Sequence, residues 1–493
     1  MKIVQLNRRD FLKSSVLAGG GLSLGLPGFT NIVEAGAGTS LPPYLRIAPD
    51  GGIYLGVPSA EMGQGTHTTL AMLLAEELEV EMSQIHHIET LHHPDFKHPT
   101  FREWTNSAAN FQMTGGSVSI RAWHLPFRKL GATARELLRR AASQKWNVPL
   151  VECRAANGRI THSGNGRSIG YGELVGSASR LTPDINSKLK APEQFRLLGK
   201  PVPRWDTREK VKGTAVFGTD VDLPGMLYGT VKHCVVFGEK LTGVDDTKAK
   251  AVPGVISIIP LEDQAVVVAD STWAAMKGAK ELTLHTSGGH KDLSDESIIQ
   301  QFRSDLVKSG VPVAHRGDPA TAIDKAIRVM ELEYEASMQA HAAMEPLCAT
   351  ASVTAEGCEV WAPTQSSDFA MYMGMGVTGL PPEKIKVHTT YLGGGFGRKV
   401  ESDFITAPLV ASMKLGKPVK ITWTREEDTR HDFYRPPFLI HMQFSLDVHG
   451  MPQGLRAKLV GPAVSRRWQM PPPWLEENGY DWLEKRVEEG GIN

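Results

Sequence analysis

Cysteine is scarce in this sequence. The 493 residues contain only four, and no two of them form a C-x-x-C pair. Iron–sulfur clusters and zinc ribbons need closely spaced thiolates, so neither is expected on this chain alone. Four cysteines scattered over this length are more typical of core residues than of a disulfide framework, and they are Cys153, Cys234, Cys348 and Cys358.

Net charge and hydrolase motifs are also absent. Lys+Arg and Asp+Glu both total 54, and a nucleic-acid binder would normally carry a basic excess. No G-x-S-x-G elbow or recognisable nucleophilic cysteine is present, which argues against a hydrolase. The remaining composition, 41% hydrophobic and 22% charged, is typical of a soluble globular protein, and the length suggests about three domains.

The N-terminal segment lacks a hydrophobic run long enough to span a membrane, but it has the features of an export signal. Arg8 and Arg9 precede Phe11 and Leu12, an apolar and glycine-rich run covers residues 16–29, and small residues cluster at 33–37. This order resembles a twin-arginine signal peptide. It predicts a signal over residues 1–37 and a periplasmic protein, anchored to the membrane if the signal is not cleaved. A chance Arg-Arg pair in a disordered tail is the simpler alternative.

Two glycine-rich turns each open a predicted helix. The first, at residues 61–65, precedes leucines spaced along one helical face, and the second, at residues 114–117, precedes a similar pattern over residues 130–141. Each helix would begin with exposed backbone N–H groups. Ahead of the first turn, apolar residues flank Pro49-Asp50-Gly51-Gly52, which predicts a hairpin over residues 45–57.

The second half of the chain has a different texture. Short β-like runs such as 211–218 and 226–236 predict a smaller α+β domain. A polar helix is expected at residues 292–308. The last region contains predicted strands at residues 360–362 and 419–423.

The segment Leu392–Lys399 is the densest local motif, because four of its eight residues are glycines. Glycines let backbone N–H groups approach an anionic or planar ligand closely. A Walker loop is excluded because Val400 follows Lys399, and the dinucleotide fingerprint is excluded because Arg398 stands where its last glycine is required. A tight turn without a ligand is the alternative interpretation.

Two polar features near the first turn have competing interpretations. Gln64 lies between two glycines at a helix entrance, where its carboxamide can both donate to and accept from a pterin or an oxo group. Taken alone, a capping turn is the better interpretation of this residue. Five histidines crowd the following segment, but their spacing matches no metal motif and predicts a surface loop: His86, His87, His92, His93 and His98.

Seven dispersed stretches occur in a specific order, at residues 61–67, 114–117, 213–218, 344–346, 361–365, 393–399 and 423–428. Together they resemble the large subunit of molybdenum hydroxylases of the isoquinoline 1-oxidoreductase type, within the xanthine oxidase superfamily. The resemblance extends from about residue 42 to the end of the sequence.

The resemblance implies a mixed α+β fold, namely a molybdopterin-binding domain of the aldehyde oxidase/xanthine dehydrogenase type with an inserted α/β-hammerhead domain. After the signal, the expected regions are a first molybdopterin-binding region at 42–195, the hammerhead-like domain at 204–290 and a second molybdopterin-binding region at 320–493.

It also implies the site. The family's cofactor is molybdopterin cytosine dinucleotide, whose dithiolene holds the molybdenum, so no protein metal ligand is expected. The implied cofactor-binding residues are Gln64 and Gly65 at the metal and pterin, Gly115, Gly116 and Ser117 at the phosphates, Gln365 at an apical oxygen ligand, and Gly394, Gly395, Phe396 and Gly397 around the cofactor. Phe396 and Arg435 would face substrate. Val400 stands where some purine-oxidising relatives carry glutamate, and Glu401 is one step away.

The implied reaction is hydroxylation of an N-heteroaromatic or aldehyde substrate with water as the oxygen source, with electrons leaving through a small [2Fe–2S] partner subunit. The family's general base is a glutamate in a Gly-Val-Gly-Glu-like motif, which this sequence lacks. We therefore expect roughly the last third of the subunit to be missing, a complementary fragment to supply it, and apolar surface to be exposed at that edge. The alternative is a non-catalytic remnant or a scaffold for partner subunits.

Overall fold

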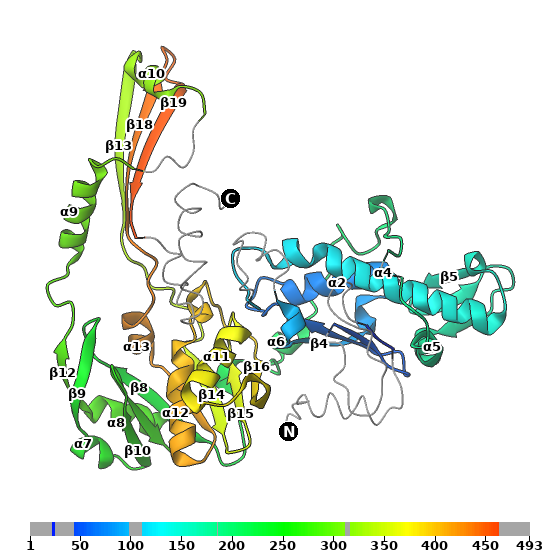
Figure 1. Cartoon of the computed structure of the whole chain (residues 1–493), viewed down its shortest axis with the longest axis horizontal. Coiled ribbons are helices and arrows are strands. Elements are labelled where there is room, and N and C mark those ends of the chain that lie inside the picture. Colours follow the sequence, from blue (N-terminus) through cyan, green and yellow to red (C-terminus); the bar gives the residue numbers. More distant parts are fainter. Residues whose placement is uncertain (1–21, 25–43, 98–110, 185, 311–315, 463–493) are drawn as a thin grey trace. The chain divides into compact units, whose positions relative to one another are not determined.

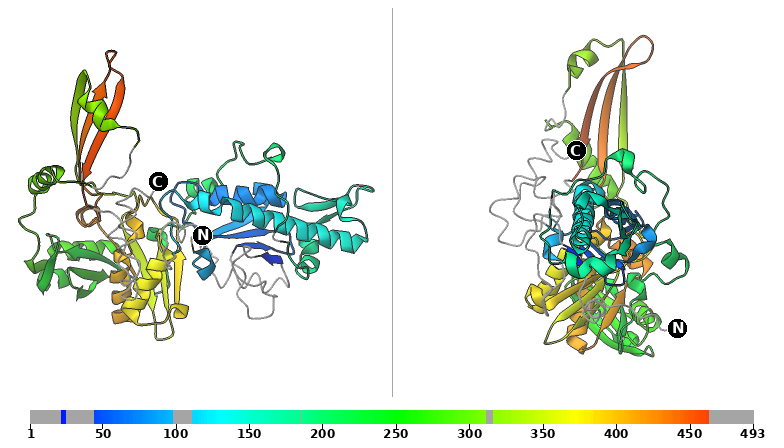
Figure 2. Two further views of the ribbon diagram at one scale, coloured as in Figure 1. Left: turned by 45° about the horizontal axis from the view of Figure 1, so that its top comes forward. Right: turned by 90° about the vertical axis from the view of Figure 1, so that its right-hand side faces the viewer.

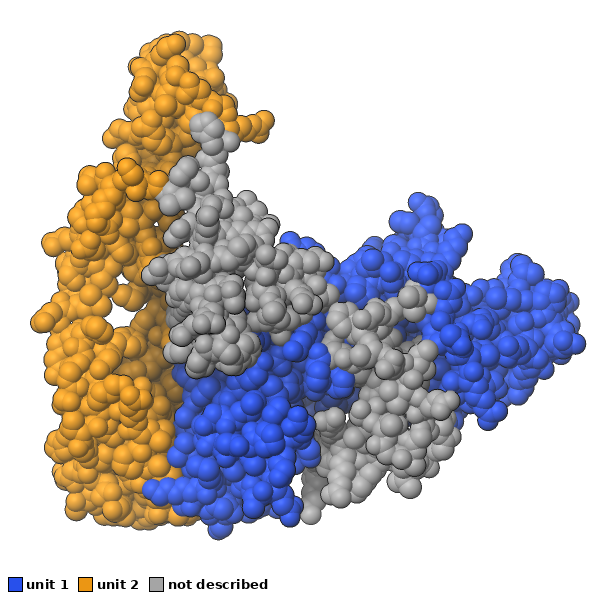
Figure 3. All heavy atoms as spheres, viewed as in Figure 1, with its two compact units in different colours: residues 1–99, 110–229, 343–422 blue, residues 100–109, 230–342, 423–493 orange. Residues whose placement is uncertain are grey.

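The computed structural model describes residues 22–24, 44–97, 111–184, 186–310 and 316–462. Its contacts divide the chain into two compact units, coloured separately in Figure 3. Unit 1 combines residues 1–99, 110–229 and 343–422, and unit 2 combines residues 100–109, 230–342 and 423–493. Helices and strands are mixed in both units, as the sequence predicted. The domain boundaries expected from the resemblance stay a prediction.

Unit 1 is built from two groups of elements, coloured from blue to cyan and from yellow to orange in Figure 1. Its strands are β1 (Leu22–Leu24), β2 (Leu45–Ile47), β3 (Ile53–Val57), β4 (Ile85–Thr90), β5 (Cys153–Ala156), β6 (Arg159–His162), β7 (Ser168–Gly170), β14 (Cys348–Val353), β15 (Cys358–Ala362), β16 (Ile385–Thr389) and β17 (Val419–Thr422). Its helices are α2 (Thr66–Leu78), α4 (Ser119–Trp146), α5 (Tyr171–Ala178), α6 (Thr207–Val211), α11 (Ser367–Thr378) and α12 (Thr406–Leu415). Strand β8 (Leu227–His233) begins in unit 1 and ends in unit 2.

The predicted hairpin and both predicted helices are confirmed. Strands β2 and β3 pair antiparallel, with Leu45 opposite Leu55, and β4 joins β3 in parallel. Helices α2 and α4 lie side by side over one face of this sheet (Figures 1 and 2). The leucines at the predicted helical spacing, among them Leu70, Leu74 and Leu138, are buried in the core between the layers.

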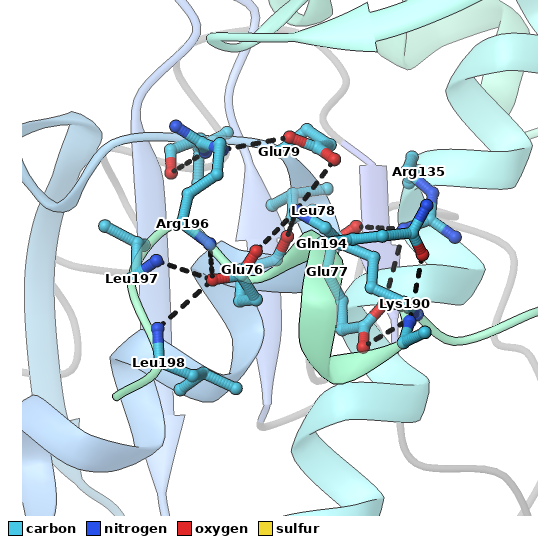
Figure 4. A network of polar contacts seen from close by, with 12 residues as sticks. Glu76, Glu77, Leu78, Glu79, Arg135, Lys190, Gln194, Arg196, Leu197 and Leu198 are labelled. Atoms are coloured by element: carbon cyan, nitrogen blue, oxygen red, sulfur yellow. Dashed lines mark hydrogen bonds and ion pairs between the residues drawn. The ribbon is translucent and has the colours of Figure 1, made fainter. Parts of the chain in front are cut away.

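Buried carboxylates fasten helix α2 to the segment 188–198 (Figure 4). Glu76 and Glu77 are both fully buried. Glu76 Oε2 accepts hydrogen bonds from the backbone N–H groups of Leu197 (2.6 Å) and Arg196 (2.8 Å), and the carboxylate forms an ion pair with Lys190. Burial alone would raise the pKa of Glu76, but the Lys190 ammonium and these N–H groups lower it.

We expect Glu76→Ala to destabilise unit 1 strongly, because it removes the acceptor of three backbone N–H groups and leaves the buried Lys190 ammonium with Glu79 as its one carboxylate partner among the described residues. Removing one partner of a buried ion pair typically costs about 3–5 kcal/mol. Urea unfolding followed by tryptophan fluorescence measures the loss. The control is Glu193→Ala, at an exposed glutamate of the same unit; equal midpoints for the two variants would contradict the prediction.

The yellow and orange strands form a further sheet of unit 1, in addition to the three-stranded sheet β5-β6-β7. Strand β14 pairs antiparallel with β15 and β17, β15 pairs in parallel with β16, and β17 pairs in parallel with the first residues of β8. The predicted strands at residues 360–362 and 419–423 are therefore confirmed, the second ending at Thr422.

Two local predictions are wrong. Residues 211–218 form no extended strand: Val211 ends helix α6, and the N–H groups of Thr214 and Ala215 both donate to Glu209 O at the helix end. The segment makes one isolated β-bridge, between Phe217 and Tyr391, and no continuous strand pairing. His86 and His87 lie in strand β4 and not in a surface loop, because Ile85, Ile88 and Thr90 of the same segment are buried where β4 pairs with β3.

In the described part of unit 2, two antiparallel strand pairs and one three-stranded antiparallel sheet are accompanied by helices. Its elements are β9 (Glu239–Asp245), α7 (Thr247–Lys250), β10 (Val255–Pro260), β11 (Gln264–Ala269), α8 (Thr272–Glu281), β12 (Thr283–Gly288), α9 (Asp295–Leu306), α10 (Pro319–Asp324), β13 (Arg328–Ala336), α13 (Arg425–Arg430), β18 (Phe438–Leu446) and β19 (Pro452–Val460). Strand β9 pairs with β12, β10 with β11, and β18 with both β13 and β19, all antiparallel. Helix α9 confirms the predicted polar helix.

Several predictions concern the N-terminus and the membrane. The paired arginines of the expected signal, and His98, lie outside the described residues. Residues 22–24, inside the expected apolar run, form β1 and pair with β2. In the part of the chain that the structure describes, no helix combines the length and hydrophobicity needed to cross a bilayer.

Candidate functional site

Two other loops of unit 1 contact Thr114, the residue that precedes the second glycine turn. Its hydroxyl accepts a hydrogen bond from the N–H of Ala60, at 2.8 Å, on the loop that leads into the first glycine turn. Its N–H donates to the carbonyl of Gln365 at 2.7 Å. The side chain is almost fully buried. The turns singled out in the sequence therefore lie together, although 54 and 251 residues separate these partners.

Gln365 connects the second glycine turn to the glycine cluster. Its Nε2 donates to Thr114 O at 2.8 Å, and its Oε1 accepts from Gly397 N–H at 3.0 Å. Its own N–H donates to Lys399 O at 2.8 Å. Both ends of the buried carboxamide thus hold protein loops in place. The role predicted for Gln365, toward an apical oxygen ligand of a metal, stays a prediction.

The first glycine turn is occupied by a carboxylate of the protein itself. Glu61, almost fully buried, accepts hydrogen bonds from Gly63 N–H (2.9 Å), Gly65 N–H (3.1 Å) and His67 N–H (3.1 Å). These groups surround the start of helix α2, where a negative charge is favourable. Arg204 Nη2 neutralises the carboxylate at 3.0 Å. The N–H groups expected to be open at this helix start are therefore already bonded.

Gln64 is exposed, and its carboxamide is bonded within its own loop. Its Oε1 accepts from Met62 N–H and its Nε2 donates to Ala60 O, both at 2.8 Å. These bonds close the turn ahead of helix α2 and do not cap the helix, whose N-cap residue Gly65 has no side-chain cap hydrogen bond, so the capping interpretation of Gln64 is wrong. The predicted contacts of Gln64 and Gly65 with a cofactor stay predictions, and for Gln64 they would need either the second N–H of Nε2 or a rotation of the side chain.

The second glycine turn is open. Gly116 and Ser117 are exposed and have positive φ angles of 59° and 55°, immediately before the 28-residue helix α4. No side chain caps this helix, and its first turn contains no acidic residue. Within the described residues, the N–H groups of Gly115, Gly116 and Ser117 donate to no acceptor. A long helix that begins with unpaired N–H groups is a ready site for an anion.

The glycine cluster folds back tightly against Gln365. Gly394, Phe396 and Gly397 all have positive φ, at 91°, 57° and 105°. A Cβ atom on Gly395 would lie only 2.5 Å from Gln365 Oε1. The N–H groups of residues 394–396 have no hydrogen-bond acceptor in the described part of the chain, so this loop also offers free donors to a ligand.

A buried ion pair that sequence reasoning missed holds the base of this loop. Glu345 Oε2 accepts from Lys399 Nζ at 2.7 Å and from Gly393 N–H at 3.0 Å. Lys399 is fully buried. Cys348 lies beside Glu345, and burial together with that carboxylate holds the pKa of the Cys348 thiol well above its ordinary value. Glu345 belonged to one of the family-like stretches, but the sequence indicated no partner for it.

The two predicted substrate-facing residues fall in different units. Phe396 belongs to unit 1 and is 61% exposed, as a side chain that contacts a ligand would be. Arg435 belongs to unit 2, where it is exposed and its backbone pairs with Gln339. Both roles stay predictions.

His67 is a buried neutral imidazole beside the first turn. Thr90 Oγ1 donates its hydrogen to Ser59 O at 3.0 Å, so it accepts from His67 Nε2 at 2.9 Å. This places the proton on Nε2, and Nδ1 has no hydrogen-bond partner among the described residues. Burial lowers the pKa of His67 to about 4, against the opposing influence of Glu61 and Asp206.

This depressed pKa predicts acid sensitivity. In the unfolded chain His67 takes up a proton near pH 6.5, whereas in the folded chain it stays neutral down to about pH 4. The contribution of His67 to the free energy of unfolding therefore has its full value above pH 6.5. Between pH 6.5 and pH 4 it falls by roughly 3 kcal/mol, because only the unfolded chain protonates His67 there. We expect urea unfolding at pH 7.5 and pH 5 to show a larger loss for the wild type than for His67→Gln. Equal losses would contradict this role of His67.

Comparisons with known proteins identify two domain families in this chain. Residues 9–222 match one molybdopterin cofactor-binding domain family, and residues 303–463 match a second. The chain belongs to the xanthine oxidase family of molybdopterin-binding subunits. The first and second glycine turns lie in the first matched region. Gln365 and the glycine cluster lie in the second.

Similar curated proteins are bacterial oxidoreductases. The chain is 28% identical to isoquinoline 1-oxidoreductase subunit beta of Brevundimonas diminuta, over 80% of this chain and 55% of that protein. It is 29% identical to a membrane-bound aldehyde dehydrogenase of Gluconacetobacter polyoxogenes, over 90% of this chain and 58% of that protein. This molybdopterin-binding chain thus spans little more than half the length of these relatives.

A solved structure with a similar arrangement is the aldehyde oxidoreductase of Desulfovibrio gigas. It has a TM-score of 0.44 and 19% identity, over 59% of this chain and 38% of that one. The mixed α/β molybdopterin-binding fold predicted from the sequence is confirmed by the two matched domain families and by the mixture of helices and strands in both units.

Proposed function

We propose that this chain is the cofactor-binding part of a molybdenum hydroxylase, with unit 1 holding a molybdopterin dinucleotide. The proposal rests mainly on one observation. Two glycine loops, at residues 115–117 and 394–396, have backbone N–H groups with no acceptor among the described residues, and the Gln365 side chain is hydrogen-bonded to the residues next to both loops. Free donors on two coupled loops suit a ligand that is anionic at one end and planar and polar at the other.

The residues fit such a group in two ways. The uncapped start of helix α4 offers its N–H groups and its positive dipole end to phosphate oxygens. Glycine at position 395 lets the loop pack directly against Gln365, and the N–H groups of residues 394–396, which have no acceptor among the described residues, are left for a ring system. When bound, the molybdenum centre would supply the oxidative hydroxylation chemistry. This chain's residues would bind and orient it.

The finer features of this function are part of the proposal. We infer that the dinucleotide is the cytosine form, that electrons leave through a small [2Fe–2S] subunit, and that the substrate is an N-heteroaromatic compound or an aldehyde. The substrate class is supported by the relatives, which are named for isoquinoline and aldehyde oxidation. The separate iron–sulfur subunit is supported by the scarcity of cysteines, since the sequence has no closely spaced pair to hold a cluster. The twin-arginine motif supports export to the periplasm.

A complementary polypeptide is a further proposed partner, and the sheet of unit 2 supports it. The register of β13, β18 and β19 places nine apolar residues on one face, and none of them is buried: Met330, Leu332, Tyr334, Ile440, Met442, Phe444, Leu455, Ala457 and Leu459. An apolar face of this extent normally contacts another protein surface. The relatives are longer than this chain, and we propose that the complementary polypeptide corresponds to the part of them that this chain does not match.

Cofactor analysis of the protein purified from its native host tests the proposal. We expect near-stoichiometric molybdenum by mass spectrometry and release of cytidine monophosphate on acid hydrolysis. In Ser117→Asp, a carboxylate replaces the hydroxyl at the phosphate turn, where aspartate tolerates the positive φ, and bound molybdenum should fall at least tenfold.

Ser177→Asp, at an exposed position of helix α5, is the matched control and should keep full occupancy. Absence of molybdenum from the wild-type protein together with its partner subunits, or equal occupancy in the two variants, would overturn the assignment of this site.

A further inference from the structure

A cluster of two histidines and a glutamate lies in unit 2, outside the cofactor loops. His233 ends strand β8, while Glu427 and His431 are four residues apart on helix α13 and its C-terminal cap. One nitrogen or oxygen ligand atom of each side chain lies within 4.8 Å of the other two. Among the described residues, this is the one such group of three or more histidine, cysteine or carboxylate side chains.

We propose that His233, Glu427 and His431 bind a divalent transition-metal ion of the zinc class. Two imidazole nitrogens and one carboxylate oxygen are the donor set that zinc and its neighbours prefer, whereas calcium and magnesium require oxygen ligands. The site is formed by this chain alone, and it does not depend on the molybdopterin function proposed for unit 1.

The backbone positions these three side chains for a common ligand. Residues four apart on a helix project from the same face, so Glu427 and His431 both face the end of β8. The N–H of His431 donates to Glu427 O at 2.9 Å, which continues the helix as far as the histidine. Glu427 Oε2 also accepts from the N–H of His233 at 3.0 Å, which ties the carboxylate to the strand.

The rings have the compactness that a shared ion requires. The imidazoles of His233 and His431 stack with centroids 4.2 Å apart and an angle of 22° between their planes. His233 Nδ1 lies 2.7 Å from Glu427 Oε2. Zinc bonds of about 2.0–2.1 Å place tetrahedral ligand atoms roughly 3.3 Å apart. Because the stacked rings direct their in-plane nitrogen lone pairs side by side, one imidazole has to turn about its χ angles before both nitrogens face a common ion, and Glu427 has to lengthen its contact with His233.

An aromatic wall surrounds the cluster. Trp423 packs against His233, with ring centroids 4.5 Å apart, and Phe237 meets the ring of His431 edge to face at 5.7 Å. His233 is buried, and Glu427 and His431 are half-buried. A hydrophobic shell limits water access and orients the ligands of a metal. The partial exposure of the helix side leaves an entry path and a fourth coordination position for water.

Metal titration of the full-length protein tests the site. After chelator treatment and gel filtration, we expect one equivalent of Zn²⁺ to bind in competition with a chromophoric chelator. Co²⁺ should give the visible absorption bands of a tetrahedral or five-coordinate site. Zn²⁺ should also raise the Tm, because an ion that binds only the folded protein stabilises it.

Three variants assign the ligands. Glu427→Gln and His431→Gln keep similar volumes and should each weaken zinc binding at least tenfold, whereas His449→Gln, at an exposed loop histidine of the same unit, should bind like the wild type. Circular dichroism verifies that each variant is folded, and the Co²⁺ spectrum of whichever variant folds gives the answer. A wild-type protein that binds no equivalent of zinc, or equal affinity in all three variants, would show that the cluster is only a hydrogen-bonded imidazole pair.

Discussion

Glu345→Ala is expected to lose both stability and bound cofactor. The substitution removes the one hydrogen-bond acceptor that Lys399 Nζ has among the described residues, and Lys399 is fully buried. An uncompensated buried ammonium costs about 3–5 kcal/mol. The same change removes the acceptor of Gly393 N–H, at the base of the glycine cluster. We therefore expect a lower urea midpoint together with at least a tenfold loss of bound molybdenum.

A charge-balanced variant separates these two effects. Glu345→Gln combined with Lys399→Met removes both charges and keeps a carbonyl acceptor for Gly393, so it should recover much of the lost stability. Glu383→Ala, at an exposed glutamate of unit 1, controls for the loss of a surface charge. If Glu345→Ala and Glu383→Ala had equal urea midpoints, the structural role given to the Glu345–Lys399 pair would be wrong.

Gly395→Ala is expected to abolish most cofactor binding while the fold persists. The new methyl group would lie 2.5 Å from Gln365 Oε1 and 3.2 Å from Met62 Sδ, so the Gln365 side chain has to move. That movement breaks the bridge between Gly397 and Thr114. Overpacking of this kind typically costs about 1–3 kcal/mol, less than the stability of most domains.

Molybdenum and nucleotide content of the purified Gly395→Ala variant give the measurement, with the Tm recorded in parallel. Gly376→Ala is the matched control, because a Cβ at this exposed position of helix α11 meets no atom within 4 Å. Alanine there should be neutral or slightly stabilising. Full cofactor content in the Gly395→Ala variant would show that Gln365 does not need its present position.

Much of the fold was predictable wherever a local pattern decided the structure. The hairpin at residues 45–57 follows from a strong turn between apolar residues, and helices α2 and α4 follow from leucines at helical spacing. The strand expected at residues 211–218 was wrong because a helix end competes for the same backbone. The two N–H groups that donate to Glu209 O are not available to a ladder. Gly213, which follows the C-cap Lys212 with a φ of 67°, was the available sequence signal for this helix end.

The candidate site was predictable as a set of loops, and less so as a set of contacts. Order along the sequence identified the glycine turns, and the structure brings them together through Thr114 and Gln365. The polar residues that hold the loops were not found, because Glu345 and Lys399 are 54 residues apart. Pairing over that distance depends on tertiary packing, which a single sequence does not encode in any local spacing.

The carboxylate of Glu61 has a consequence for how a charged ligand would choose its direction. Two long helices of unit 1 begin at glycine turns, and to an incoming phosphate they would otherwise offer equivalent electropositive ends. At one of them the chain supplies its own fixed anion, bonded to Gly63, Gly65 and His67. The N–H groups at that end are occupied and the carboxylate is paired with Arg204, so this end offers no donors to a second anion, whereas the entrance of helix α4 does. We therefore expect the anionic tail of the proposed ligand to lie at the start of helix α4.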